Sequence, residues 1–366
     1  MLKFSWVVVV RKPKSLGEVR IKPKNNKKKI IIITVISVLG LLLLTGLFYF
    51  LLSMNDDSKK KEDVKIDDAT TVEKKDLTVY DVNSNRRPIA IMIDNNAGNN
   101  AHVGLQDAYL TYEIIVEGGL TRIMAIFKDV NTSVIGPVRS SRHYFLDYAL
   151  ESDAIYAHYG WSTFAQNDIR SLGVNNINGL YDSGYYRNYN IAAPHNVFTS
   201  IEDLYNVAGS KGYSTTSDNY ELLNYTTDEV NFNDTSDLLT ANNISMTYSY
   251  SQVRSYTYDA TNRYYLRYMN NSPHTDRDSG VQYHYKNIII MKVNNSTLDS
   301  YGRQDLDTVG SGEGYYITNG YAVPITWSKD SRSGKTHYYY SGNELVVSDG
   351  NTMIQVVPLS SSISIN

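Results

Sequence analysis

The longest apolar run of the chain spans residues 30–52, which include no charged side chain and are rich in Ile and Leu. At about 1.5 Å per residue, a helix of this length crosses a hydrocarbon core of about 30 Å with some tilt. Three lysines, at positions 27–29, precede it, and positive flanks stay on the cytoplasmic side. The pattern predicts a single-pass transmembrane helix, with a cytoplasmic N-terminus and the C-terminal domains outside the cell membrane.

A cleaved signal peptide is the alternative interpretation of this run. Its apolar core would span about 7–15 residues and end at a small-residue cleavage site. The run is longer, and Ser53-Met54-Asn55-Asp56 is a poor cleavage site. The chain has no cysteine, so lipid attachment to a cysteine after the run is excluded. We therefore expect a retained anchor, with the lipid bilayer as a partner through residues 30–52.

Beyond this run, the hydrophobic pattern predicts a stalk and two folded domains. Residues 53–78 contain eight acids, six lysines and few large apolar groups, which is typical of a flexible stalk. Over 79–230, apolar runs alternate with helical stripes and predict a mixed α/β domain. Over 240–360, short β-branched or aromatic runs separated by turn pairs predict a mostly antiparallel β domain. The predicted fold class is α+β, preceded by one transmembrane helix.

Individual elements of the first domain can be placed from the same pattern. Strands are expected at 89–93, 109–116, 122–129 and 154–158, with a hairpin across Gly118-Gly119. Helices are expected after Tyr144, from Thr163 and from Ser200, where apolar residues recur at helical spacing.

The formal net charge of −3 conceals two opposed populations. Residues 1–29 carry +9, residues 30–52 carry none, and the remainder therefore carries −12. The basic segment fits a cytoplasmic tail attracted to anionic lipid. That attraction is worth about 1 kcal/mol for each positive charge near the membrane surface. The acidic remainder argues against nucleic acid as a partner.

The absence of cysteine excludes disulfides, a thiol nucleophile and Cys-ligated metals. The chain has no P-loop and no dinucleotide fingerprint after a strand, so no cofactor is expected. It also has no HExxH motif, and the segment 276–280 departs from an EF-hand loop, so no metal site is predicted.

The densest polar cluster is the segment 136–143, Gly-Pro-Val-Arg-Ser-Ser-Arg-His, between a strand and a helix. Backbone N–H groups and a helix dipole favour anions there. Arg139, Ser140, Arg142 and the nearby Arg122 are the predicted ligand-binding residues, since guanidinium groups grip carboxylate or phosphate. The alternative is that these arginines pair internally, with Glu113, Glu117 or Asp147.

Three residues are candidates for catalysis: Glu117, His158 and His195. Glu117 and Glu113 lie about 13 Å apart along one strand, too far for a glycosidase carboxylate pair. His158 ends a strand before a loop, although the following Gly160-Trp161-Ser162 does not complete a nucleophile elbow. For both histidines, a hydrogen-bonded structural role is the alternative.

Of the 32 tyrosines, 31 follow residue 52. Aromatic rings stack on sugar faces, but tyrosine is also a good strand former and a half-buried filler in β domains. An uncharged glycan ligand therefore remains an alternative to core packing.

Seven short motifs occur together in a fixed order. They are Asn85-Arg86-Arg87-Pro88-Ile89-Ala90, Glu117-Gly118-Gly119-Leu120-Thr121-Arg122, Gly136-Pro137-Val138-Arg139-Ser140-Ser141-Arg142, Ala193-Pro194-His195-Asn196, Pro273-His274-Thr275-Asp276, Gly302-Arg303 and Trp327-Ser328-Lys329. Over residues 80–358, this chain resembles the YerB-like family of exported bacterial lipoproteins, which is defined by a domain of unknown function. The resemblance implies an α+β domain and a mainly β domain on the outer face of a Gram-positive-type membrane. Members carry a lipobox cysteine that this chain lacks, so its anchor is expected to be the helix 30–52.

The leading hypothesis is a membrane-anchored cell-envelope protein that binds cell-wall glycan or a wall-synthesis partner through the 136–143 loop, with His158 and His195 nearby. The alternative is an envelope hydrolase or transferase acting on an anionic wall polymer. In a third interpretation, all these groups form an internal ion-pair network.

Overall fold

The computed structural model describes residues 76–96, 102–218, 221–230, 232 and 236–366, and these fall in one compact unit. The predicted cytoplasmic tail 1–29, the predicted transmembrane helix 30–52 and the predicted stalk up to residue 75 lie outside the described residues. Within the described ranges, no helix is both long and apolar enough to cross a bilayer.

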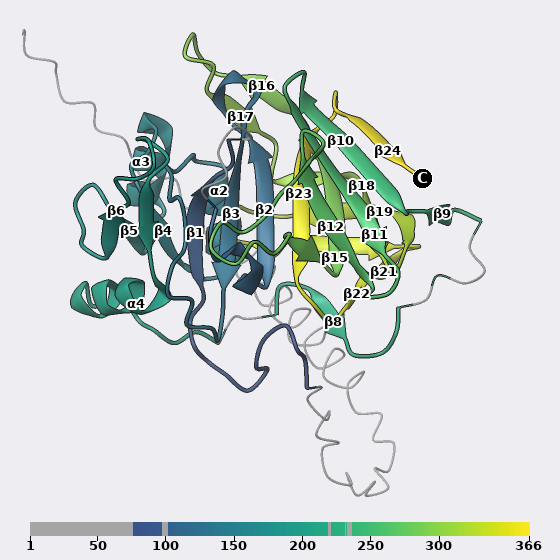
Figure 1. Cartoon of the computed structure of the whole chain (residues 1–366), viewed down its shortest axis with the longest axis horizontal. Coiled ribbons are helices and arrows are strands. Elements are labelled where there is room, and N and C mark those ends of the chain that lie inside the picture. The colour runs from purple at the N-terminus through teal and green to yellow at the C-terminus, as the bar shows by residue number, and fades with distance from the viewer. Residues whose placement is uncertain (1–75, 97–101, 219–220, 231, 233–235) are drawn as a thin grey trace, which may run out of the picture. The chain divides into compact units, whose positions relative to one another are not determined.

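A large mixed sheet runs through the molecule (Figure 1). Its strands are, in spatial order, β21 (Asn343–Glu344), β20 (His337–Tyr340), β19 (Tyr321–Lys329), β18 (Gly310–Thr318), β15 (Asn287–Val293), β23 (Thr352–Pro358), β2 (Leu110–Ile115), β3 (Thr121–Phe127), β1 (Ile89–Asp94), β4 (Ile155–His158) and β5 (Asn176–Asn178), with β9 (Leu239–Thr240) paired to β19.

A second sheet and three small ladders complete the β structure. The second sheet has the order β13 (Ser272–Pro273), β12 (Tyr264–Met269), β11 (Gln252–Asp259), β10 (Asn243–Ser249) and β24 (Ser362–Ile365), with β14 (His284–Tyr285) paired to β12. The ladders are β16 (Asn295–Thr297) with β17 (Gln304–Leu306), β22 (Val346–Ser348) with β8 (Asn224–Thr226), and β6 (Tyr185–Arg187) with β7 (Val197–Thr199).

Few helices accompany these strands. The described α-helices are α2 (Phe145–Glu151), α3 (Thr163–Ser171) and α4 (Ile201–Ser210), and the 3₁₀ helices are η1 (Leu105–Asp107) and η2 (Glu117–Gly119). The serines that precede α3 and α4 cap them, since Ser162 Oγ accepts from the Ala165 N–H and Ser200 Oγ from the Asp203 N–H. Helices at these two places are what the periodicity predicts.

The predicted α+β fold class is wrong, because the described chain is mostly β with three short α-helices. Hydrophobic periodicity identifies strands and helices one at a time. It does not show that strands from both halves of the chain share one sheet. The parallel strand β23 lies between β2 and β15, with Gln355 opposite Glu113 on one side and Ile290 on the other.

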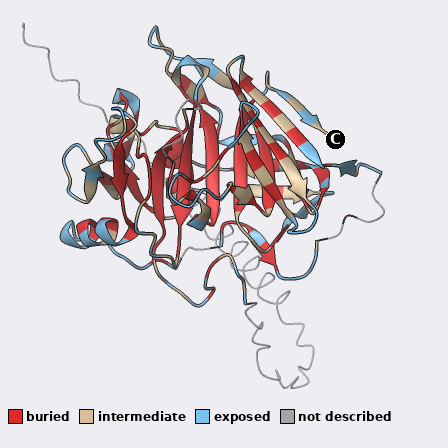
Figure 2. Ribbon diagram, viewed as in Figure 1, coloured by how far each residue is buried: buried red, intermediate tan, exposed pale blue. Residues whose placement is uncertain are grey.

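Two faces of the large sheet are covered differently, and we name each by a residue of β2. On the Tyr112 face, the ring of Tyr112 stacks on Tyr148 of α2 at 4.4 Å between centroids. On the Glu113 face, α4 packs its Ile201 and Leu204 over the β1 end. The second sheet covers the same face over β2, where its arginines reach Glu113. The central strands are therefore buried on both faces (Figure 2).

Candidate functional site

Polar residues gather where the parallel strands β1 and β4 end. Asp94 is the last residue of β1, and His158 is the last residue of β4. The segment 136–143 runs between these two ends, since the Arg139 N–H donates to the Met92 carbonyl at 2.8 Å and the Tyr159 N–H donates to the Arg139 carbonyl at 2.9 Å. The carboxyl edge of parallel strands is a common place for ligand sites in α/β sheets.

Asp94 holds two partners at this edge. The residue is 4% exposed, and its Oδ2 accepts a hydrogen bond from His195 Nδ1 and lies 3.4 Å from Arg139 Nε. Burial would raise the pKa of Asp94, but Arg139 and His195 outweigh it and hold that pKa below its usual range. The carboxylate thus stays charged and fixes the orientation of the imidazole ring. The His195 side chain is 24% exposed, and no hydrogen bond engages its Nε2 within the described chain.

Arg122 stands beside this pair with no carboxylate of its own. It is 7% exposed, and the described residues place no acidic oxygen within ion-pair distance of it. Its Nη1 donates to the Ser140 carbonyl. Burial, followed by the nearby charges of Arg142 and Arg139, lowers the pKa of Arg122 to about 10. A buried cation without a counter-ion is costly, so the site carries an unbalanced positive charge.

Arg142 and Glu117 form a two-pronged ion pair. Arg142 Nη2 donates to Glu117 Oε2 at 2.8 Å, and Arg142 Nε donates to Oε1. Burial would raise the pKa of Glu117, but Arg142 outweighs it and lowers that pKa. Internal pairing of this kind is the alternative to ligand binding that we considered for these arginines. Glu117 therefore acts in the structure as a partner of Arg142.

His158 is buried, and an acceptor oxygen lies near each of its ring nitrogens, of which the neutral ring can donate to one. Nδ1 lies 2.8 Å from the Gly160 carbonyl, and Nε2 lies 3.3 Å from Asn176 Oδ1. Burial lowers the pKa of His158 to about 4, so the ring is neutral at physiological pH. Ser140 is also engaged, since its hydroxyl donates to the Tyr159 carbonyl at 2.9 Å.

The structure thus groups the predicted residues unequally. We give the name arginine group to Arg122, Arg139 and Arg142. The charges of Arg142 and Arg139 lower the pKa of Arg122. His195 is linked to this group through Asp94, which also contacts Arg139. His158 takes part instead in local bonds of the β4 end. No three metal-ligating side chains converge in the part of the chain that the structure describes.

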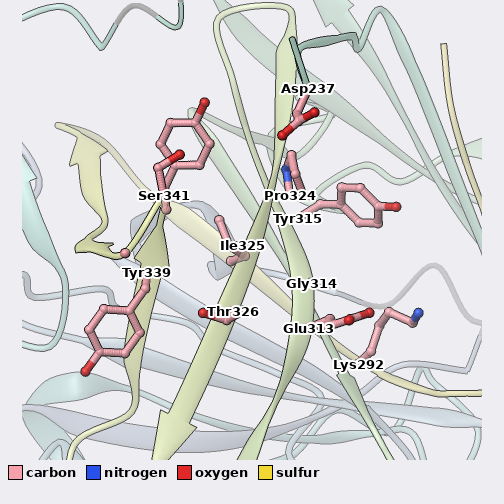
Figure 3. Close-up of a pocket in the computed structure, with 12 residues that line it drawn as sticks. Asp237, Lys292, Glu313, Gly314, Tyr315, Pro324, Ile325, Thr326, Tyr339 and Ser341 are labelled. Atoms are coloured by element: carbon pink, nitrogen blue, oxygen red, sulfur yellow. The ribbon is translucent and has the colours of Figure 1, made fainter. Parts of the chain in front are cut away.

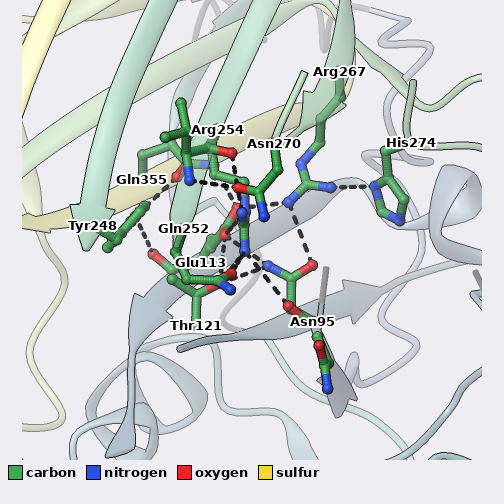
Figure 4. Close-up of polar contacts among 12 residues, drawn as sticks. Asn95, Glu113, Thr121, Tyr248, Gln252, Arg254, Arg267, Asn270, His274 and Gln355 are labelled. Carbon is green, nitrogen blue, oxygen red and sulfur yellow. Dashed lines mark hydrogen bonds and ion pairs between the residues drawn. The ribbon is translucent and has the colours of Figure 1, made fainter. Parts of the chain in front are cut away.

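A buried charge cluster centres on Glu113 (Figure 4). Glu113 Oε1 accepts from Arg254 Nε at 2.6 Å, and Oε2 accepts from Arg267 Nη2 at 2.8 Å and Gln355 Nε2 at 3.0 Å. Burial would raise the pKa of Glu113, but Arg254 and Arg267 outweigh it and lower that pKa to about 2. Because the two arginines come from β11 and β12, the cluster ties the second sheet to the first.

Asn95 connects this cluster to the carboxyl edge. It follows Asp94 directly, and its Nδ2 donates to Glu113 Oε1 at 2.6 Å and to Thr121 Oγ1 at 2.8 Å. The sequence pattern predicts only a turn at Asp94 and Asn95, and it does not single out Arg254 or Arg267. Two signals were available: polar residues directly after a buried strand, and arginines at the inward positions of an alternating strand.

Comparison with known proteins shows two matching family models. Residues 77–214 match the N-terminal domain, and residues 244–354 the C-terminal domain, of the "Protein of unknown function (DUF3048)" family. The chain is also 30% identical over 278 residues to the "Putative lipoprotein YerB" of Bacillus subtilis (strain 168), covering 75% of this chain and 82% of that protein.

The fold is also similar to a solved structure. The crystal structure of the YerB protein from Bacillus subtilis matches with a TM-score of 0.68 and 29% identity, over 76% of this chain and 94% of that one. The matched N-terminal domain includes Asp94, His195 and the arginine group, and the matched C-terminal domain includes Arg254 and Arg267.

Proposed function

Because the chain belongs to the DUF3048 family of YerB-like proteins, we propose that its two matched domains work together at the cell envelope, outside the cytoplasmic membrane. The support is the name of its relative, a lipoprotein, which is a class of protein held at a membrane by attached lipid. The −12 charge of the chain after residue 52 adds to this view, since it disfavours a nucleic-acid partner inside the cell.

The proposed activity is binding of an anionic wall polymer by the arginine group. The observation that carries it is Arg122, a buried guanidinium with no carboxylate partner among the described residues. Within the described ranges, three guanidinium groups share two carboxylates, those of Asp94 and Glu117. A ligand carboxylate or phosphate at this edge would supply the missing negative charge and accept paired N–H bonds.

Sedimentation with insoluble cell-wall material tests this proposal. The full-length chain is mixed with sacculi that retain their phosphate-bearing teichoic acids, or with sacculi stripped of them so that only peptidoglycan carboxylates remain. We expect Arg139→Gln to weaken binding at least tenfold to whichever preparation the native chain binds. Arg263→Gln is the matched control, because Arg263 is a half-exposed arginine paired with Glu229 elsewhere. Equal binding by native chain and Arg139→Gln would contradict the proposal.

A second candidate function is hydrolysis or group transfer on the same polymer, with His195 as general base. The observation in its favour is the Asp94 carboxylate on His195 Nδ1, which leaves Nε2 to take a proton from water or a hydroxyl group. Incubation of the full-length chain with wall material should then release products that are lost in His195→Gln. If the native chain binds wall material and releases nothing, the catalytic candidate fails while the binding proposal stands.

A further inference from the structure

The second sheet leaves one end of the Glu113 face uncovered. Along this face, one row of opposed residues runs from Glu113 through Gln355 and Ile290 to Tyr315 and Pro324. Ile290 and Gln355 are fully buried, whereas Tyr315 is half-buried and Pro324 is exposed. As far as the described residues are concerned, the face therefore opens to solvent at β18 and stays open across β19 and β20.

The next row on this open face is polar. Glu313 lies opposite Thr326, and Thr326 lies opposite Tyr339, so that three neighbouring strands each contribute one side chain. Lys292 lies beside Glu313, since the preceding Met291 is opposite Gly314. Neither Glu313 nor Lys292 forms a side-chain ion pair with any described residue. Charged groups are thus available to a ligand here.

The solvent-exposed end of the first row, Tyr315 and Pro324, and the polar second row line a pocket of about 460 Å³ (Figure 3). Its aromatic walls come from Tyr315, Tyr339 and Tyr340, and its charged groups are Asp237, Glu313 and Lys292. In Figure 3, the Tyr315 ring and the Tyr339 ring lie on opposite sides of β19, with Thr326 between them on that strand. The pocket is a trough that crosses the strands.

The tyrosines of this trough differ from those that fill the core. On the opposite face of the same strands, Tyr316 and Tyr338 are buried, and Tyr316 donates its hydroxyl to Asn287. Tyr315 and Tyr340 also pack against the core with part of their surface, but all three trough tyrosines keep the rest of their surface in solvent, where a ligand can reach it.

We infer that this trough binds a neutral, extended chain of pyranose sugars. Sugar rings have apolar C–H faces that suit tyrosine rings, and hydroxyl rims that suit carboxylates and an ammonium group. Adjacent strands are about 4.8 Å apart, which is close to the length of one pyranose ring, so each strand along a row can meet one sugar unit. The inference is independent of the arginine group, because its ligand is uncharged and its residues lie at the other end of the sheet.

Isothermal titration of the full-length chain with chitotetraose, a straight β-1,4-linked tetramer of N-acetylglucosamine, tests the inference. We expect saturable binding by the native chain, loss of at least tenfold in affinity in Tyr339→Ala, and a several-fold loss in Glu313→Gln. Glu313 is exposed, so its variant tests the site even if Tyr339→Ala disturbs folding. Tyr189→Ala is the control, because Tyr189 is 87% exposed and lies outside the trough.

Two further titrations distinguish the trough from the arginine group and from nonspecific binding of sugars. Binding to chitotetraose should be unchanged in Arg139→Gln. The inference about the trough therefore stands even if the proposed anion binding by the arginine group fails. Maltotetraose, a curved α-1,4-linked tetramer, should bind at least tenfold more weakly, because a straight row suits a straight chain. No binding of chitotetraose at millimolar concentration, equal affinity for both sugars, or full affinity in Glu313→Gln and Tyr339→Ala would each overturn the inference.

Discussion

Asp94 and Arg122 are register partners on the neighbouring strands β1 and β3, yet their charges are not paired with each other. The Asp94 carboxylate turns to His195 and Arg139 and leaves the buried Arg122 guanidinium without a carboxylate among the described residues. Opposite charges directly across a ladder would ordinarily stabilise it. The arrangement instead concentrates positive charge at the carboxyl edge.

Neutralising Arg122 should therefore separate stability from binding. In Arg122→Gln, we expect the free energy of unfolding to change by less than about 1 kcal/mol, because no ion pair is broken and one desolvated charge is removed. Wall binding should fall at least tenfold. Urea unfolding and sedimentation with sacculi measure the two quantities. If Arg122→Gln unfolds the chain, Arg122 is a structural cation and the anion site is not supported.

Removing the charge of Glu113 should have the opposite effect on stability. In Glu113→Gln, two buried arginines lose their shared carboxylate, and breaking a buried pair typically costs about 3–5 kcal/mol. Urea unfolding should show this loss.

The matched control for this change is Glu117→Gln. Its ion pair with Arg142 is partly exposed, and its loss should cost about 1 kcal/mol. If both substitutions destabilised the chain equally, the Glu113 cluster would not be the main link between the sheets.

Stability should fall as the pH drops from 6.5 towards 4, in part because of His158. Its pKa is lowered from 6.5 to about 4 by burial, so the unfolded chain binds a proton in this window before the folded chain does. The contribution of His158 to the free energy of unfolding is fully present above pH 6.5. About 3 kcal/mol of it should be lost by pH 4.

Urea unfolding at several pH values measures this dependence. His158→Gln should flatten the decline of unfolding free energy with falling pH, whereas His337→Gln, at a partly exposed histidine, should change the slope much less. An unchanged slope in His158→Gln would show that folding does not lower the pKa of His158.

Binding of sacculi should weaken as salt rises, because the proposed contacts are charge pairs that counter-ions screen. Affinity measured between 50 and 500 mM NaCl should decline steeply for the native chain and less steeply for Arg139→Gln, which has one fewer contact with the polymer. A salt-independent affinity would exclude the arginine group as the main contact.

Local elements of the fold could be predicted from the sequence. The strand at 89–93 and the helices beginning near Thr163 and Ser200 are present, because each depends on nearby periodicity and capping residues. The place of β23 between β2 and β15 could not be predicted, because such pairing depends on residues distant along the chain. The error in fold class has another cause, because the described helices are few and short beside the many strands.

The candidate site could likewise be predicted only in part from the sequence. The arginines of the 136–143 segment stand out because Arg139, Arg142 and a Gly-Pro turn lie close together in the sequence. Their partners do not stand out in the sequence. Asp94 and His195 are separated by about a hundred residues and meet only through the fold. Arg254 and Arg267 acquire their role only because β11 and β12 pack on Glu113.

The central position of β23 also has a consequence for synthesis of the chain on the ribosome. Strands β2 and β15 are both made before β23, so each has an open edge until the last part of the chain emerges. Unpaired apolar edges recruit other strands, so a nascent or truncated chain is expected to aggregate or to need a chaperone. The centre of the large sheet can therefore close only after residues 352–358 have been made.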